Sequence, residues 1–176
     1  MNIYLLDRNL RVCDTLSNDG DAKSSPFFND EYIQYLETGA ETFEFETLES
    51  DYLENGNYVA FSYKDDYKLF QISEIEDIHE DNLIKKIYCE VAGLELTYEI
   101  MRPRTIASAN IKQFMSTVLS DTSWEVGYID EDITDVYTIE IDDYEKIYDL
   151  IQEYIKKYQC EISFRVVIKN AKVIHK

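Results

Sequence analysis

The chain has 176 residues, which is the usual size of one domain and just enough for two small ones. Its hydrophobic fraction of 45% and its aromatic fraction of 14% exclude a disordered acidic tail, because such tails are poor in aromatic residues. The 17 basic and 36 acidic residues give a formal net charge of −19. Nucleic acids and anionic membranes are disfavoured as partners, since both are bound through Lys and Arg. We therefore predict no sequence-specific binding of nucleic acid.

The predicted elements of the first hundred residues are β-strands joined by short turns and one loop. From Phe43 to Thr47, apolar and acidic residues alternate, so the phenylalanines face a core and the glutamates face water. Turns are expected at residues 64–66 and 80–82, and a loop over residues 18–26, where small and acidic residues gather. In chain order, the predicted strands are Ile3 to Leu6, Leu10 to Leu16, Phe43 to Thr47, Tyr58 to Tyr63, Tyr67 to Ile78 and Leu83 to Tyr98.

Apolar residues in the second part of the chain follow helical spacing twice. From Ile111 to Leu119 they recur at i, i+3, i+4, i+7 and i+8, which predicts an amphipathic helix capped by Ser108 or Asn110. A second helix is expected after Asp142, because apolar residues from Ile147 to Tyr158 repeat this spacing. The strands predicted here are Trp124 to Ile129, Val136 to Ile141, Cys160 to Ile168 and Lys172 to His175.

This order of elements predicts an α+β protein with a boundary near Pro103. Residues 1–102 would form an antiparallel, β-barrel-like subdomain. Residues 103–176 would form a smaller α/β subdomain with two amphipathic helices. The apolar run Ile3 to Leu6 is too short for a signal peptide or a membrane span, so we expect no membrane segment and synthesis in the cytoplasm.

The histidines and cysteines show no ligand or nucleophile pattern. His79-Glu80 begins like the zinc motif H-E-x-x-H, but the last position is Leu83, and His175 has no Cys or carboxylate at ligand spacing. There is no Cys-x-x-Cys pair, so neither a zinc knuckle nor a disulfide framework is expected, and a reducing compartment is the natural prediction. Cys89 and Cys160 share parity with apolar neighbours and are predicted to be buried. Cys13 lies on a face with Arg11, a cation that would lower the pKa of the thiol, but a lone thiol without a base is predicted to be inert.

The acidic residues single out no catalytic pair. Asp130, Glu131, Asp132 and Asp135 resemble a calcium loop, but Asp135 stands where that loop needs glycine, so a solvated turn is predicted. The chain has neither a glycine-rich phosphate loop nor a nucleophile elbow. We therefore predict no catalytic, cofactor-binding or metal-binding residues. The 15 tyrosines favour a protein assembly surface. The alternatives are a carbohydrate-binding module that uses Tyr and Trp124, or a cell-wall hydrolase fragment that uses paired carboxylates.

An ordered series of segments resembles the N-terminal region of siphophage and prophage tail-tip hub proteins. This is the prophage tail endopeptidase or tail-associated lysin family, also labelled phage minor structural protein. The segments are Tyr4 to Leu10, Asp14 to Asp21, Tyr35 to Phe45, Gly56 to Phe61, Tyr67 to Ile75, Tyr88 to Pro103 and Ser108 to Asp130.

The resemblance implies a structural protein of the virion tail tip. Such hubs form a ring-like homotrimer that closes the distal tail tube and contacts the distal tail protein and the tape measure protein. Lytic or host-binding activity would belong to C-terminal modules beyond Lys176, so the chain is expected to be a non-enzymatic fragment of a longer hub region. As a further hypothesis, carboxylates such as Glu44 and Glu46 would face the lumen and repel the DNA phosphates.

Overall fold

The computed structural model describes residues 1–20, 24–48, 50–64, 66–78, 84–169 and 172–175. Most of these residues form antiparallel strands, and the helices are few and short. The elements are β1 (Asn2–Leu6), β2 (Val12–Ser17), β3 (Phe27–Tyr35), β4 (Ala40–Leu48), β5 (Tyr58–Tyr63), β6 (Asp66–Asp77), β7 (Ile84–Val91), the 3-10 helix η1 (Ala92–Thr97), β8 (Ile100–Met101), β9 (Arg104–Asn110), α1 (Ile111–Val118), β10 (Val136–Ile141), β11 (Glu145–Lys146), α2 (Ile147–Lys157), β12 (Val166–Lys169) and β13 (Lys172–His175).

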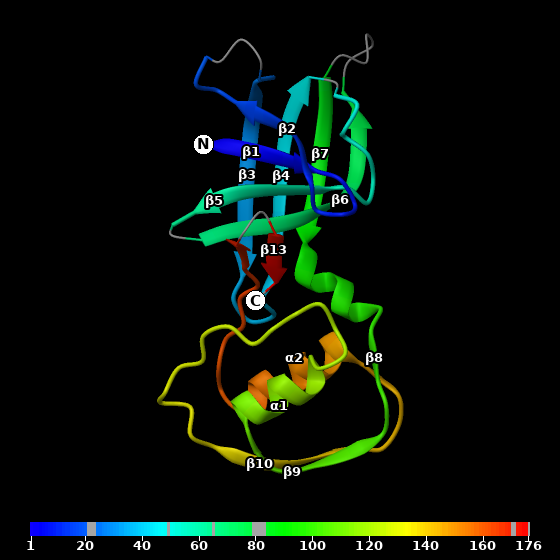
Figure 1. The fold of residues 1–176 in the computed structure, drawn as a ribbon, viewed down its shortest axis with the longest axis vertical. Helices are drawn as coiled ribbons and strands as arrows, with labels where there is room; N and C mark the ends of the chain where they lie inside the picture. The colour runs from blue at the N-terminus through cyan, green and yellow to red at the C-terminus, as the bar shows by residue number, and fades with distance from the viewer. Residues whose placement is uncertain (21–23, 49, 65, 79–83, 170–171, 176) are drawn as a thin grey trace.

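One curved antiparallel sheet contains the strands of the first hundred residues, in the order β2-β1-β5-β6-β7-β4-β3. In Figure 1, β1 and β5 run across β3, β4 and β7, so the sheet folds over as a half-barrel. Strand β6 pairs with β5 through residues Asp66 to Gln71 and with β7 through residues Phe70 to Asp77, and a bulge between Ile72 and Glu74 shifts its register with β7. The prediction of a β-rich, mostly antiparallel fold is therefore confirmed.

Phenylalanine rings fill the interior of the half-barrel. Phe43 and Phe45 on β4 are buried, as the alternation predicts, while Glu44 and Glu46 point to the other face. The ring centroids of Phe43 and Phe61 lie 4.5 Å apart, and those of Phe61 and Phe70 lie 5.6 Å apart. These contacts join β4, β5 and β6 on the concave side of the sheet, so they stabilise its curvature.

Both predicted helices are present, and they pack on each other beside the small ladder of β9 and β10 (Figure 1). Asn110 caps α1 by accepting from the Gln113 N–H, and the Gln113 side chain accepts from the Asn110 N–H in return. The ring centroids of Phe114 on α1 and Tyr154 on α2 lie 4.9 Å apart. Helix α2 begins at Ile147 rather than directly after Asp142, because β11 first pairs with β8.

The chain leaves the helical part and returns to the large sheet. Strand β12 pairs with β6 through Val166 and Tyr67, and β13 pairs with β12. The predicted division between residues 102 and 103 stays a prediction. Among the described helices, none has the length and apolar character that a membrane crossing requires.

Several strand predictions differ from the structure, beginning with the strand predicted from Leu10 to Leu16, which runs over Val12–Ser17. The strand predicted from Leu83 to Tyr98 ends at Val91, and η1 follows it. The strand predicted from Trp124 to Ile129 is absent, and the strand predicted from Cys160 to Ile168 starts only at Val166, as β12. Strands β3, β8, β9 and β11 were not predicted. In β3, exposed residues at most positions hide the alternation. The turn at residues 80–82 and the turn residue Asp65 lie outside the described residues.

Close packing explains why the strand stops at Val91. A Cβ atom on Gly93 would lie 2.4 Å from Cδ1 of the Phe164 ring, so this ring occupies the space that a side chain on the next strand residues would need. Phe164 is 5% exposed and packs edge-on against Trp124, with ring centroids 5.1 Å apart. The η1 segment is therefore shaped by the segment that returns from α2.

We expect Gly93→Ala to lower the free energy of unfolding by about 1–3 kcal/mol, because the Phe164 ring must move from a packed site. Chemical denaturation of both proteins measures the loss. In the Gly93→Ala background, Phe164→Leu is expected to recover part of it. If Gly93→Ala is as stable as the wild type, the close approach of the Phe164 ring is not what shapes η1.

Candidate functional site

His175 lies in a polar cluster at the junction between the helices and the large sheet. Its Nδ1 atom is 3.3 Å from Ser123 Oγ and 3.5 Å from Glu95 Oε1, and its ring centroid is 4.7 Å from that of Trp124. The side chain is buried. His79 and Glu80, which the sequence analysis rejected as a zinc motif, lie outside the described residues.

Ser123, His175 and Glu95 do not form a hydrolase triad, although all three residue types are present. In a triad, the acid holds Nδ1 and the serine delivers its proton to Nε2. Here Ser123 and Glu95 both face Nδ1, and Ser123 Oγ donates to Glu95 Oε1 at 3.2 Å. Nε2 is buried and contacts no hydrogen-bonding group among the described residues. The contacts of the cluster join η1, the segment after α1 and β13.

The Glu95 carboxylate accepts hydrogen bonds that favour its charged form. Burial of this carboxyl raises its pKa, but hydrogen bonds from His175, Trp124 and Ser123 together outweigh the burial, so the pKa of Glu95 lies below its ordinary value. The Trp124 Nε1–H donates to Glu95 Oε1 at 2.6 Å. Trp124 is 4% exposed, so its ring is not presented to solvent as a platform for sugar binding.

Because its pKa is lowered in the folded state, the ionised Glu95 carboxylate raises the free energy of unfolding, and this contribution disappears at low pH. The folded state binds this proton less readily than the unfolded chain, so the contribution is present above about pH 4.5 and is lost as the pH falls through the folded-state pKa. We expect the stability difference between wild type and Glu95→Gln to be largest near pH 7 and to shrink below pH 4.5. Denaturant midpoints between pH 7 and pH 3 measure it, with the exposed Glu99→Gln as the matched control. A difference that stays constant with pH would contradict this account.

The three cysteines are buried or half-buried. Cys89 is fully buried, and burial raises its pKa well above the usual value. Cys160 is half-buried rather than buried, because it follows α2 in a segment outside any ladder, and burial raises its pKa as well. Cys13 is half-buried and donates to the Arg11 carbonyl at 3.3 Å.

Asp130 Oδ1 accepts from the Asp132 N–H at 3.1 Å in a solvated turn. Within the described ranges, no three His, Cys, Asp or Glu side chains gather where they could hold a metal ion.

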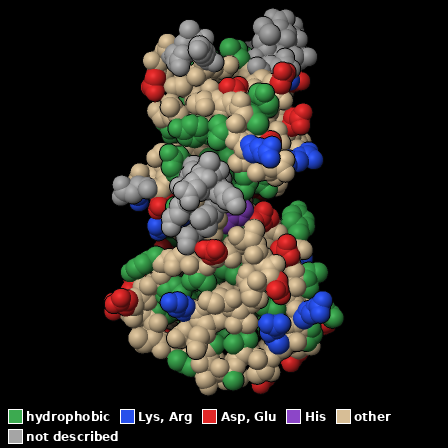
Figure 2. Space-filling view, in the orientation of Figure 1, with side chains coloured by type: hydrophobic (Ala, Val, Ile, Leu, Met, Phe, Trp, Pro, Cys, Tyr) green, Lys and Arg blue, Asp and Glu red, His purple; other side chains and the backbone are tan. Residues whose placement is uncertain are grey.

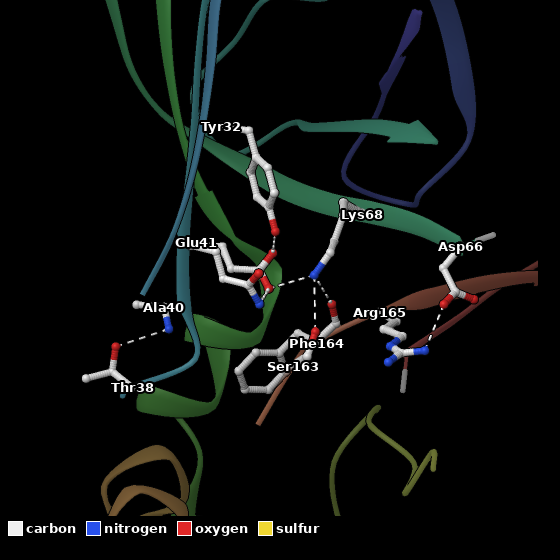
Figure 3. A network of polar contacts seen from close by, with 10 residues as sticks. Tyr32, Thr38, Ala40, Glu41, Asp66, Lys68, Ser163, Phe164 and Arg165 are labelled. Atoms are coloured by element: carbon white, nitrogen blue, oxygen red, sulfur yellow. Dashed lines mark hydrogen bonds and ion pairs between the residues drawn. The ribbon is translucent and has the colours of Figure 1, made fainter. Parts of the chain in front are cut away.

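A buried ion pair fastens the segment after α2 to the large sheet (Figure 3). Lys68 Nζ on β6 lies 2.6 Å from Glu41 Oε1 on β4, and both side chains are almost completely buried. The same Nζ donates to Ser163 Oγ at 3.2 Å and to the Phe164 carbonyl at 3.3 Å. The Lys68 ammonium thus uses three acceptors from two distant parts of the chain.

Tyr32 supplies the second hydrogen bond to Glu41. Its hydroxyl donates to Glu41 Oε2 at 3.0 Å, and burial together with this carboxylate raises the pKa of Tyr32 far above its usual value. Beside the pair, Arg165 Nη1 binds Asp66 Oδ2 at 2.8 Å on the surface. We call Glu41, Lys68, Tyr32, Ser163 and Phe164 the ionic junction. The alternation that marks Phe43 and Phe45 as core also includes Glu41, and this was the sequence signal for a buried carboxylate.

Acidic side chains on the outer face of the sheet are partly neutralised. Glu44 Oε1 lies 2.9 Å from Lys86 Nζ on the neighbouring strand β7. This contact is the largest cause of a raised pKa at Lys86. Figure 2 shows acidic side chains over both the sheet and the helical part, interspersed with hydrophobic and basic ones. That Glu44 and Glu46 face a lumen stays a prediction.

An apolar groove of about 610 Å³ lies between the helices and two extended segments, residues 124–130 and 160–165. Side chains from α1 and α2 form its floor, and the two extended segments form its walls. Its apolar lining includes Ile111, Met115, Leu119, Trp124, Val126, Ile129, Ile133, Ile151, Ile155, Ile162 and Phe164.

A family model and a solved structure of prophage tail proteins both match this chain. Residues 98–175 match the family model of the prophage endopeptidase tail domain. The chain is also similar in structure to prophage tail protein gp18 from Listeria monocytogenes EGD-e, with a TM-score of 0.66 and 15% sequence identity. That match covers 100% of this chain and 50% of gp18, so the chain spans half the length of that protein. No curated protein matches the sequence. The resemblance to a prophage tail protein region, predicted from the sequence, is confirmed by these two matches.

Proposed function

We propose that this chain is a structural, non-enzymatic part of a phage or prophage tail, located at the tail tip. In this proposal it belongs to the baseplate hub, a ring-like homotrimer that closes the distal tail tube. The distal tail protein and the tape measure protein are its partners, and host-contact or lytic modules are carried by the rest of the hub. The observation that carries the proposal is the likeness of the whole chain, rather than one part of it, to a prophage tail protein.

The arrangement of the chain supports a role in holding parts in a fixed orientation. A half-barrel sheet and a smaller helical part, the proposed α+β subdomains, are joined by the ionic junction through Lys68 and by the return of β12 to β6. The hydroxyl of Tyr148 on α2 also donates to the Thr38 carbonyl, in the turn between β3 and β4, at 3.2 Å. Contacts of this kind suit a subunit that aligns a tube with the module that follows it.

Immunogold labelling of virions from an induced prophage tests the location. Antibodies raised against the purified chain are expected to label the end of the tail that is distal to the capsid. Antibodies against a capsid protein serve as the control for labelling geometry. Label along the whole tail, on the capsid or absent from virions would contradict the proposal.

A further inference from the structure

Two segments with the sequence pattern of strands pair with no strand in the structure. Strands were predicted over residues 124–129 and 160–168, but residues 124–129 and 160–165 lie outside every ladder except for a single bridge between Trp124 and His175. Among the described residues, the N–H groups from Val126 to Ile129 and from Glu161 to Ser163 donate to no acceptor. Gly127, Tyr128 and Glu161 are exposed, so the backbone groups of these segments are open to pairing with an added strand.

Both segments line the same apolar groove. Figure 1 shows the segment that follows α1 and the segment that leads from α2 to β12 near the boundary between the helices and the sheet. The groove volume of about 610 Å³ lies within the range of ligand sites, roughly 300–1,000 Å³. Tyr128 stands at its rim with 80% of its surface exposed, where an aromatic side chain is available to a partner.

The rim of the groove is acidic. Asp130 and Glu161 line it, and Asp66 lines it as an ion pair with Arg165, the basic residue among the described lining residues. The net charge of −19 adds to this negative potential. An occupant with basic ends is therefore attracted to the groove, and an acidic occupant is repelled.

We propose that this groove binds an extended segment of a partner protein, with alternating apolar residues flanked by Lys or Arg. The segment would add as a strand beside residues 126–129 or 161–163. The backbone of the segment would form hydrogen bonds with the N–H and C=O groups of these residues, and every second side chain would pack against the apolar side chains of the groove. The proposal rests on the groove itself and does not require the tail-tip location.

The test uses synthetic nonapeptides of the pattern acetyl-KKVTITVKK-amide, with the apolar positions varied among Val, Ile, Leu and Phe. Trp124 is the single tryptophan of the chain, so its fluorescence reports on the groove, and calorimetry detects binding that leaves the fluorescence unchanged. We expect saturable binding for at least one peptide. Replacing its central residue by Pro, or all its Lys by Glu, is expected to weaken binding by at least about tenfold, because each change removes strand hydrogen bonding or charge attraction.

Matched variants locate the binding site. Val126→Lys places a cation on the groove wall and is expected to weaken binding by at least about tenfold, whereas Val136→Lys, at an exposed position on β10, leaves binding unchanged. Hydrogen exchange is expected to slow at the amides of residues 126–129 or 161–163 when the peptide is bound. Thermal unfolding of both variants verifies that they are folded.

Three outcomes overturn the proposal. The first is the absence of binding by both fluorescence and calorimetry across the peptide set. The second is equal affinity for the Pro-containing peptide, which would indicate a site for apolar molecules in general. The third is self-association of the chain that Val126→Lys abolishes, which would assign the groove to a second copy.

Discussion

Lys68→Met is expected to lower the free energy of unfolding by about 3–5 kcal/mol, because it leaves the Glu41 carboxylate buried without its cation. The Ser163 hydroxyl and the Phe164 carbonyl also lose their donor. Urea or guanidinium denaturation at pH 7 measures the loss. The matched control is Lys157→Met, which breaks the exposed ion pair with Glu153 and is expected to cost less than about 1 kcal/mol.

The double variant Glu41→Leu with Lys68→Met separates the cost of an orphaned charge from the value of the pair. Removing both partners removes the uncompensated charge, so most of the lost stability is expected to return. If the Lys68→Met change costs no more than the Lys157→Met control, the ionic junction does not fasten the returning segment to the sheet.

Phe43→Ala is expected to cost about 3–5 kcal/mol, since it opens a cavity where the rings of Phe45, Phe61 and Phe70 meet. Phe43 is 1% exposed, so its whole ring contributes to packing. Denaturation curves again measure the loss, and Leu48→Ala on the same strand, where the side chain is 40% exposed, is the control with a small effect. A loss below about 1 kcal/mol for Phe43→Ala would mean that the half-barrel does not depend on this aromatic core.

Local patterns predicted those elements whose own residues decide their structure. Strand β5 has the predicted bounds Tyr58–Tyr63, and β10 has the predicted bounds Val136–Ile141. Helix α1 follows from its apolar spacing and the Asn110 cap. Strand β10 alternates between exposed and buried positions, α1 has one apolar face, and β5 is a short apolar run that follows Gly56-Asn57, so each can be recognised from its own residues.

Elements shaped by distant contacts escaped prediction. Residues 92–97 have a strand-like composition, but the Phe164 ring lies against Gly93 and η1 forms instead. Residues 124–129 and 160–165 have strand-like alternation without a neighbouring strand to complete a ladder. Alternation predicts which side of a segment is buried, whereas strand pairing depends on partner strands that the segment itself does not contain.

The residues of the ionic junction could likewise be predicted only in part from the sequence. Glu41 shares parity with Phe43 and Phe45, so its burial is readable in the sequence once the alternation is extended. Its partner Lys68 and the acceptors at Ser163 and Phe164 come from distant parts of the chain, and only the folded structure brings them together. The absence of a catalytic motif likewise left the Ser123, His175 and Glu95 cluster unforeseen.

Cryo-electron microscopy of the intact tail tip tests the central claim most directly. The proposal predicts density for three copies of this fold around the tail axis, with the helical part and the half-barrel in the relative orientation held by the ionic junction. It further predicts that the β4 face carrying Glu44 and Glu46 lines the channel. A tail tip in which this fold is absent, or in which it forms no ring about the axis, would contradict the assignment as a hub component.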